Sequence, residues 1–522
     1  MIGIASKDPM VDEPNVILPL ATSINERGVA GYTHSVTNSE DQRKLNCIYE
    51  LVNNHVTGKG TLSLSKRPGV TNAQFNYGAI SAGTAYMILD LNLGADTSAI
   101  FYKDGNDNKS VANGSRVILN ASTYFPGFCD MTAISNVPNA VVQLISTVGA
   151  AQKVYFASNS DVNAGNAWTQ MSASSATSAT GGFTVLFPRG KMEHMDGFAF
   201  TLNRDNKIFN SDSNSLSEWQ AASFLAKQIK QDLPVGLARL SNKLLAFGQE
   251  TVEGFYNAGN TVGSPLGRIP QLHSRIGLVP MSEAPQSSPG AGGTHYYCTI
   301  SNNLYFIGRY SNGVNCGLFA FNGSEFGKVS SSYVDKILSE RVSAGTVYSV
   351  SALMINGQSM VSISFSLPGV SPHIALLYST EWKEWFELNS TVFSSVNNGK
   401  FHLGVGTKQT SIYSFDSSDN WQDDGTSYQF MTQFRLPTNG SSRKFMPMYG
   451  IDADTDSGGL ASTLTVEASD DDCVSFSTLG TLDLTKDRKM LFRGGSFRKR
   501  FMRLSNINSR PTRIHNFLAR VS

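Results

Sequence analysis

The residues of this 522-residue chain whose spacing comes nearest to chemistry lie toward its C-terminal end. The run "TDSGG" contains a candidate nucleophile, Ser457, which would need a histidine base and a buried aspartate within reach. Three aspartates at alternate positions resemble the start of a calcium loop: Asp452, Asp454 and Asp456. Ser457 stands where that loop requires glycine, and Thr463 stands where it requires glutamate. An Asp- and Gly-rich turn accounts for this stretch better than either kind of site.

A second candidate is the run "SDDDCVSFS", residues 469–477. It partly matches the Asp-box hairpin of sialidase propellers through Ser469, Asp471 and Phe476, with Cys473 in place of glycine. In those enzymes the Asp-box is a hairpin device, and the chemistry comes from an arginine cluster and a tyrosine–carboxylate pair. A propeller glycosidase or a glycan-binding propeller protein therefore remains the alternative to a purely structural function.

Charge is divided unevenly near the C-terminus. Residues 451–472 hold seven acids and no Lys or Arg, whereas 486–520 hold eleven Lys or Arg and one acid. In "FRGGSFRKRFMRL", Phe and Arg alternate as on a nucleic-acid surface. The same alternation is typical of a half-exposed strand that pairs with the acidic segment or with a neighbouring subunit. The candidate subunit- or DNA-contacting residues are Arg493, Arg498, Lys499, Arg500 and Arg503.

The rest of the sequence does not predict an enzyme. Eight histidines are scattered without a metal-binding spacing, and five cysteines form no CxxC pair, so we expect no metal, cofactor or catalytic residue. The 42 Lys and Arg nearly balance the 41 Asp and Glu, so the whole chain has no field that attracts nucleic acid. No run of 18 apolar residues occurs, which predicts a soluble protein without a membrane-spanning segment.

The elements that would position these residues are β-hairpins. Paired apolar runs around a polar turn begin near residues 83, 139, 197, 237, 302, 348 and 400. Asn312-Gly313 and Asn322-Gly323 supply residues that tolerate the positive φ of tight turns. The spacing predicts an all-β fold, a β-propeller of about six blades with seven also compatible. A β-sandwich is the alternative arrangement for such hairpins.

We expect three parts: an N-terminal arm with entry strands (1–75), a propeller platform (76–425) and a C-terminal antiparallel β region (426–522). One helix is predicted over 215–233, because Ser215 and Glu218 form a capping box and Pro234 ends the segment. Low-complexity stretches at 172–182 and 284–293 predict surface loops.

Several segments, in order, resemble one family. A tryptophan turn at Trp219 precedes a Pro-Gly exit and a strand that leads to Gly248, and a later hairpin ends in "VSSSYVDKIL". The other residues that carry the likeness are Thr251, Glu253, Phe255, Ile276 and Gly277, and, near the start, Asn46, Cys47, Tyr49, Arg67, Pro68 and Gly69. Together they resemble the tail hub (nozzle) proteins of short-tailed bacteriophages, also called packaged-DNA stabilisation proteins.

This resemblance implies a non-enzymatic structural protein of the virion tail, assembled in the host cytoplasm. It implies a homo-hexameric ring that attaches below the head-to-tail adaptor (connector) and extends the channel for double-stranded DNA. Such a ring helps to retain packaged DNA before its ejection and anchors tailspikes, fibres or a needle. No cofactor is implied.

Overall fold

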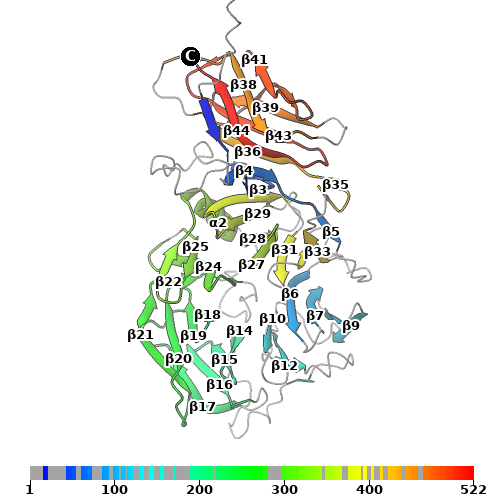
Figure 1. Cartoon of the computed structure of the whole chain (residues 1–522). Helices are drawn as coiled ribbons and strands as arrows, with labels where there is room; N and C mark the ends of the chain where they lie inside the picture. The colour runs from blue at the N-terminus through cyan, green and yellow to red at the C-terminus, as the bar shows by residue number, and fades with distance from the viewer. Residues whose placement is uncertain are drawn as a thin grey trace, which may run out of the picture. The chain divides into compact units, whose positions relative to one another are not determined.

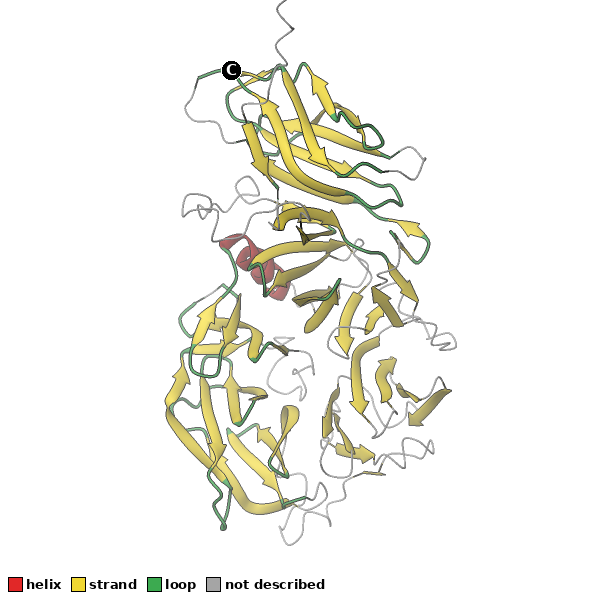
Figure 2. Ribbon diagram, in the orientation of Figure 1, coloured by secondary structure: helices red, strands yellow, loops and turns green. Residues whose placement is uncertain are grey.

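The computed structural model is built almost entirely of strands (Figures 1 and 2). Between residues 85 and 170, the residues that it describes are those of the strands given below. Elsewhere it describes residues 16–20, 43–53, 60–72, 188–214, 219–279, 296–313, 315–343, 347–366, 374–389, 392–396, 401–404, 412–415, 421–436, 442–456 and 462–522. The loops expected at 172–182 and 284–293 lie outside the described residues.

The chain forms two compact units. Unit 1 combines Met1–Val70, Trp382–Asn389 and Asp416–Ser522, and unit 2 combines Thr71–Glu381 and Ser390–Phe415. Unit 2 is therefore inserted into the sequence of unit 1. The three-part division at residues 75 and 425 stays a prediction.

Unit 2 contains seven sheets among its described residues, most of them four-stranded and antiparallel. The first sheet contains β6 (Ala85–Asn92), β7 (Ser98–Asp104), β8 (Asp107–Ala112) and β9 (Ser115–Asn120), and the second contains β10 (Cys129–Ile134), β11 (Ala140–Ile145), β12 (Lys153–Ala157) and β13 (Thr169–Gln170). The third contains β14 (Pro188–Met195), β15 (Phe198–Asn203), β16 (Lys207–Ser211) and β17 (Trp219–Ala226). The fourth contains β18 (Pro234–Leu240), β19 (Lys243–Gly248), β20 (Val252–Asn257) and β21 (Leu266–Ser274). The fifth sheet contains β22 (Ile276–Leu278), β23 (Tyr297–Ile300), β24 (Asn303–Tyr310), β25 (Gly317–Phe321) and β26 (Phe326–Lys328). The sixth contains β27 (Val347–Ile355), β28 (Gln358–Ser366) and β29 (Ile374–Ser379). The seventh contains β31 (Val392–Val396), β32 (Phe401–Gly404), β33 (Ile412–Phe415) and the early strand β5 (Val70–Asn72).

These sheets close into a ring. Each contacts the next, and the last contacts the first, through the strand pairs β6 and β10, β10 and β14, β14 and β18, β19 and β22, β23 and β27, β27 and β31, and β31 and β6 (Figure 1). This is the arrangement of a β-propeller, in which blades cover one another's faces. The predicted propeller is confirmed. The described residues form seven sheets, the higher of the two numbers that the hairpin spacing allowed.

Tight turns set the register of the hairpins. Ser301-Asn302 and Asn356-Gly357 all have positive φ, and each pair joins two directly bonded strand residues, as in a type I′ turn. Of the two Asn-Gly pairs singled out from the sequence, only Asn322-Gly323 contains a positive φ, at Gly323 (97°). Gly313 instead donates a backbone hydrogen bond to Tyr310 O over 2.8 Å.

The helix predicted over 215–233 is wrong. Residues 219–226 form strand β17, which pairs with β16 and has a register shift between Ser211 and Phe209. Across this bulge, Trp219 lies opposite Ser211 and Phe224 lies opposite Phe209. The apolar residues of β17 therefore do not alternate as on a regular strand, and their spacing was mistaken for that of a helix. The helix among the described residues is α2 (Ser332–Ser343), which follows β26 and packs against β25.

A buried carboxylate explains part of the family likeness. Asp232 accepts hydrogen bonds from Thr251 N (2.8 Å), Thr251 Oγ1 (3.0 Å) and Lys227 Nζ (2.9 Å). Lys227 and Asp232 are both buried. A Cβ on Gly248 would lie 2.2 Å from the Asp232 carboxylate, so only glycine fits there. Glu253, also buried, accepts backbone hydrogen bonds from residues 228 and 229.

Unit 1 consists of two packed sheets. One has the order β3-β4-β44-β38-β41, with β1 beside β44, and the other has the order β30-β2-β36-β43-β39-β40. Phe434 of β36 meets Phe517 of β44 between the sheets, with ring centroids 5.1 Å apart. The strands are β1 (Val16–Pro19), β2 (Arg43–Leu45), β3 (Cys47–Asn53), β4 (Gly60–Lys66), β30 (Glu384–Asn389), β36 (Phe430–Arg435), β38 (Met448–Ala453), β39 (Thr463–Ser469), β40 (Ser477–Asp483), β41 (Met490–Phe492), β43 (Phe501–Asn506) and β44 (Arg513–Arg520), with the short pairs β34 (Gln422–Asp423) and β35 (Thr426–Ser427), and β37 (Lys444–Phe445) and β42 (Ser496–Phe497).

A buried arginine joins the separate segments of unit 1. Arg67 is fully buried and makes a bidentate ion pair with Asp423, at 2.8 and 2.6 Å. Its Nε donates to Asn46 Oδ1 (3.0 Å), and its guanidinium lies 3.9 Å from the ring centroid of Tyr428. Asn46 Oδ1 also accepts from the backbone N–H of Asn389 (3.1 Å). One guanidinium and one amide thus connect all three pieces of the chain.

We predict that Arg67→Gln lowers the free energy of unfolding of unit 1 by about 3 kcal/mol, because it leaves the buried Asp423 carboxylate without its cation. Chemical denaturation followed by tryptophan fluorescence would measure the change, since Trp382, Trp385 and Trp421 lie in unit 1. Arg204→Gln is the matched control, because Arg204 is exposed and its pair with Asp205 is long, at 3.8 Å. Equal effects of the two substitutions would contradict the role given to Arg67.

Candidate functional site

The basic segment folds against the acidic segment of the same chain. Strands β43 and β39 are antiparallel neighbours with Arg503 opposite Glu467. Arg500 is 5% exposed and makes a bidentate pair with Asp470, with both N–O distances at 2.7 Å. It also donates to Gly494 O and lies over the Phe497 ring. Of the two partners that the alternation allowed, the acidic segment is the one found here.

Two further members of the predicted set have partners within the chain. Lys499 pairs with Asp472 at 2.5 Å. Arg503 lies 3.7 Å from Glu467, and its guanidinium stacks 3.4 Å from the centroid of the Phe476 ring. The charges of these residues are therefore largely compensated inside unit 1. Contact of the five predicted residues with a subunit or with DNA stays a prediction.

Arg493 and Arg498 differ from the other three. Both are exposed, and no ion pair is found for either among the residues that the structure describes. Arg493 N donates to Pro447 O, and β42, just before Arg498, pairs with β37. Next to them lie the exposed side chains of Phe445 (49%) and Phe492 (61%).

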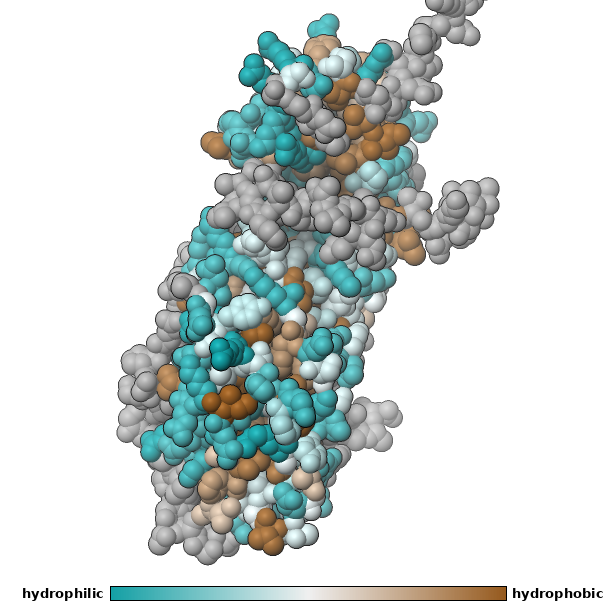
Figure 3. Space-filling view, turned by 90° about the vertical axis from the view of Figure 1, so that its left-hand side faces the viewer, coloured by the Kyte–Doolittle hydropathy of each residue, from teal (hydrophilic) through white to brown (hydrophobic). Residues whose placement is uncertain are grey.

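Arg443 completes this group, since it is exposed and its Nε donates to Ser496 Oγ over 3.0 Å. We call these five residues the arginine–phenylalanine surface: Arg443, Phe445, Phe492, Arg493 and Arg498. In Figure 3, hydrophobic side chains gather on the part of unit 1 that faces the viewer. Phe445 and Arg443 lie on β37 or beside it, outside the basic segment, so sequence reasoning missed them. The exposed face of a short β-ladder is not visible in a local charge pattern.

This surface can do two kinds of chemistry. Guanidinium groups bind phosphate or carboxylate through paired hydrogen bonds, and exposed aromatic rings stack on bases or fill a partner's apolar pocket. The first use needs guanidinium groups that are not already paired, and the second needs rings that are exposed to solvent. The surface therefore has the chemical groups for binding to DNA or to another protein.

The run that partly matches an Asp-box forms a turn between two strands. In "SDDDCVSFS", Asp471 accepts from Ser469 Oγ (2.7 Å), Ser475 N (3.0 Å) and Ser475 Oγ (2.5 Å). These hydrogen bonds, chiefly those from Ser475, lower the pKa of Asp471 to about 2. Asp471 thus holds the β39–β40 connection, as expected for a hairpin device. Ser457 of "TDSGG" lies outside the described residues.

Within the described ranges, no three His, Cys, Asp or Glu side chains are grouped so that they could hold a metal ion. None of the helices described there is long and apolar enough to cross a membrane.

The geometry defines a class: a β-propeller whose chain also forms a two-sheet β unit with exposed charged and aromatic side chains. Comparison with known proteins identifies the family within this class. The model of the family described as "Bacteriophage P22 Gp10, beta-propeller" matches residues 132–405. The chain belongs to this family of phage stabilisation proteins, and the resemblance seen in the sequence is confirmed. It is a structural, DNA-stabilising protein of a phage tail, located in the virion with other virion proteins.

Other comparisons add likenesses of shape. None of the curated proteins matches the chain. Among solved structures, the computationally designed Ika8 protein aligns with a TM-score of 0.35 and 7% identity, covering 65% of this chain and 98% of that one. A chain of the mitotic checkpoint complex aligns with a TM-score of 0.36 and 12% identity, covering 67% and 92%. A chain of the BBS1N complex with ARL6DN aligns with a TM-score of 0.29 and 11% identity, covering 74% and 99%.

We predict that Arg500→Ala destabilises unit 1 by about 2 kcal/mol, because it removes charge-assisted hydrogen bonds and leaves Gly494 O without its donor. Arg498→Ala, two residues away and exposed, should change stability by less than about 0.5 kcal/mol. Urea unfolding of the two variants makes the comparison. If Arg498→Ala proved the more damaging, the division of the basic segment into compensated and exposed arginines would be wrong.

Proposed function

We propose that this protein is the hub of a short phage tail. Six copies form a ring that attaches below the head-to-tail adaptor, extends the DNA channel, helps to retain packaged DNA and anchors tailspikes, fibres or a needle. The observation that carries this proposal is the family match over residues 132–405, which covers most of the propeller.

The physical properties of the propeller support the same function. Its sheets cover one another around a closed ring, so it is rigid without a partner and can present many loops to other proteins. A scaffold of this kind needs no catalytic residue, and we propose that the protein is not an enzyme. Copies synthesised in the host cytoplasm assemble there onto DNA-filled heads.

The proposal predicts that purified protein, mixed with isolated connector complexes, forms six-fold rings below the connector. Negative-stain electron microscopy with class averaging would show them. Particles that remain monomeric and leave the connectors bare, at protein concentrations well above that of the connector, would contradict the proposal.

A second candidate function, direct contact with packaged DNA, is favoured by the exposed Arg493 and Arg498 of the arginine–phenylalanine surface, for which the described part of the chain supplies no ion pair. We expect the double variant Arg493→Glu/Arg498→Glu to bind double-stranded DNA more weakly and to lower the salt slope of log K by about two. Fluorescence anisotropy over a salt series measures this slope.

The control is Arg204→Glu/Lys336→Glu, which makes the same change of charge at exposed positions of unit 2. Equal salt slopes for the two double variants would exclude DNA contact at this surface. If DNA binding were equal but ring assembly on connectors failed only for Arg493→Glu/Arg498→Glu, the surface would instead be a protein interface.

A further inference from the structure

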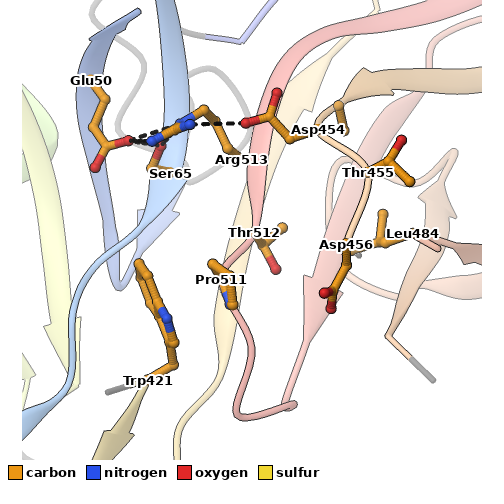
Figure 4. Close-up of a pocket in the computed structure, with 11 residues that line it drawn as sticks. Glu50, Ser65, Trp421, Asp454, Thr455, Asp456, Leu484, Pro511, Thr512 and Arg513 are labelled. Atoms are coloured by element: carbon orange, nitrogen blue, oxygen red, sulfur yellow. Dashed lines mark hydrogen bonds and ion pairs between the residues drawn. The ribbon is translucent and has the colours of Figure 1, made fainter. Parts of the chain in front are cut away.

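A pocket of about 240 Å³ opens at one end of the first sheet of unit 1 (Figure 4). Figure 4 shows the indole of Trp421 and the ring of Pro511 on one side, and Thr455 and Asp456 on the other. A row of charged side chains, Glu50, Arg513 and Asp454, closes one end. The pocket thus combines one aromatic ring with several convergent polar groups, which are the groups that fix the orientation of a bound molecule.

The charged row is held in one geometry by its own hydrogen bonds. Arg513 donates from Nε (2.9 Å) and Nη2 (2.6 Å) to Glu50 Oε2, and from Nη1 (2.9 Å) to Asp454 Oδ2. His515 Nε2 lies 2.9 Å from Asp454 Oδ1. Burial alone would raise the pKa of Asp454, but His515 and Arg513 together lower it below its usual range. Asp454 is therefore ionised at neutral pH, and the hydrogen bonds of Arg513 hold the row in place.

Two hydroxyl groups in the wall are oriented from behind. Lys489 Nζ donates to Thr455 Oγ1 over 3.0 Å, and Asn506 Nδ2 donates to Thr512 Oγ1 over 2.7 Å. Since each oxygen already accepts a hydrogen bond, its own proton can be donated to a bound molecule. The pocket therefore offers hydroxyl donors beside carboxylate acceptors.

The backbone around the pocket is also fixed. Asp454 N donates to Arg513 O and Asp456 N donates to Leu484 O, both over 3.1 Å. Trp421 directly precedes β34, whose Asp423 is held by Arg67. A ligand would lose little of its binding free energy to ordering these walls.

We propose that this pocket binds one sugar residue of a neutral polysaccharide. A pyranose ring presents a face of C–H groups, which packs on an aromatic ring, and a rim of hydroxyls, each both donor and acceptor. Trp421 supplies the first kind of contact. Thr455, Asp456 and the charged row supply the second, and the size of the pocket suits a single ring.

Charge favours a neutral ligand over an ionic one. Three acids, Glu50, Asp454 and Asp456, line the pocket with Arg513, while Lys489 and His515 lie behind Thr455 and Asp454. The cations compensate most of the negative charge, so an anion is repelled and a cation gains only the attraction of the remaining charge. The rival occupant is a lysine or arginine side chain of a protein partner, which would stack on Trp421 but would lie close to the Arg513 guanidinium. The proposal does not depend on ring formation or on the connector.

Saturation-transfer NMR on the full-length chain tests the proposal. The probes are the methyl glycosides of glucose, galactose, rhamnose and N-acetylglucosamine. We expect at least one of them to bind with a dissociation constant on the order of 1 mM. Trp421→Ala should abolish the transfer, and the isosteric Asp456→Asn should reduce it severalfold. Tyr256→Ala, which removes an exposed ring from unit 2, is the matched control and should leave the transfer unchanged.

Three results would overturn the proposal. The first is the absence of transfer to every glycoside in wild-type protein, and the second is equal transfer in wild type, Trp421→Ala and Asp456→Asn. The third is transfer to N-acetyl-lysine amide or N-acetyl-arginine amide that depends on Trp421 while no glycoside binds, which would identify a basic side chain of a partner as the occupant. Circular dichroism of each variant confirms that the sheets are intact before the comparison is made.

Discussion

The structure of unit 1 depends on one buried guanidinium. Arg67 comes from the N-terminal segment, Asp423 from the segment that follows unit 2, and Asn46 links both to β30 through Asn389. Arginine suits this position because its planar fork donates to several fixed acceptors at once and remains charged when buried. The neighbouring Gly69 is required as well, since a Cβ there would lie 2.2 Å from Gln422 O. Segments far apart in sequence therefore meet at a point where few other residues fit.

The sequence was most informative where the determining signal was local. Alternating apolar runs and turn residues predicted the hairpins, because a strand's period and a positive φ depend on neighbouring residues only. The error at 219–226 also came from a local pattern, because the bulge in β17 breaks the regular alternation that would have indicated a strand. Pairing over long distances had no such signal. Nothing near β4 indicates that Leu64 lies beside Ile514.

For the candidate sites, too, the sequence showed which residue types are present but not where the fold places them. The basic segment was visible as a run of arginines, but only the fold separates Arg500, which is buried on Asp470, from the exposed Arg498. The pocket at Trp421 was not predicted, because its walls come from six separate stretches of chain. "TDSGG" begins beside this pocket, where Thr455 and Asp456 contribute to the lining and the preceding Asp454 pairs with Arg513.

The insertion of unit 2 into unit 1 also has a mechanical consequence. Strand β1 is antiparallel to β44, so tension applied between the two ends of the chain first peels these strands apart. The bond between Arg67 and Asp423 and the pairing of Leu45 with Glu387 close unit 1 around the points where the chain departs and returns. While these two contacts hold, the applied force passes through unit 1 and does not stretch the chain of the propeller. A pull strong enough to strip β1 would leave the blades unstretched.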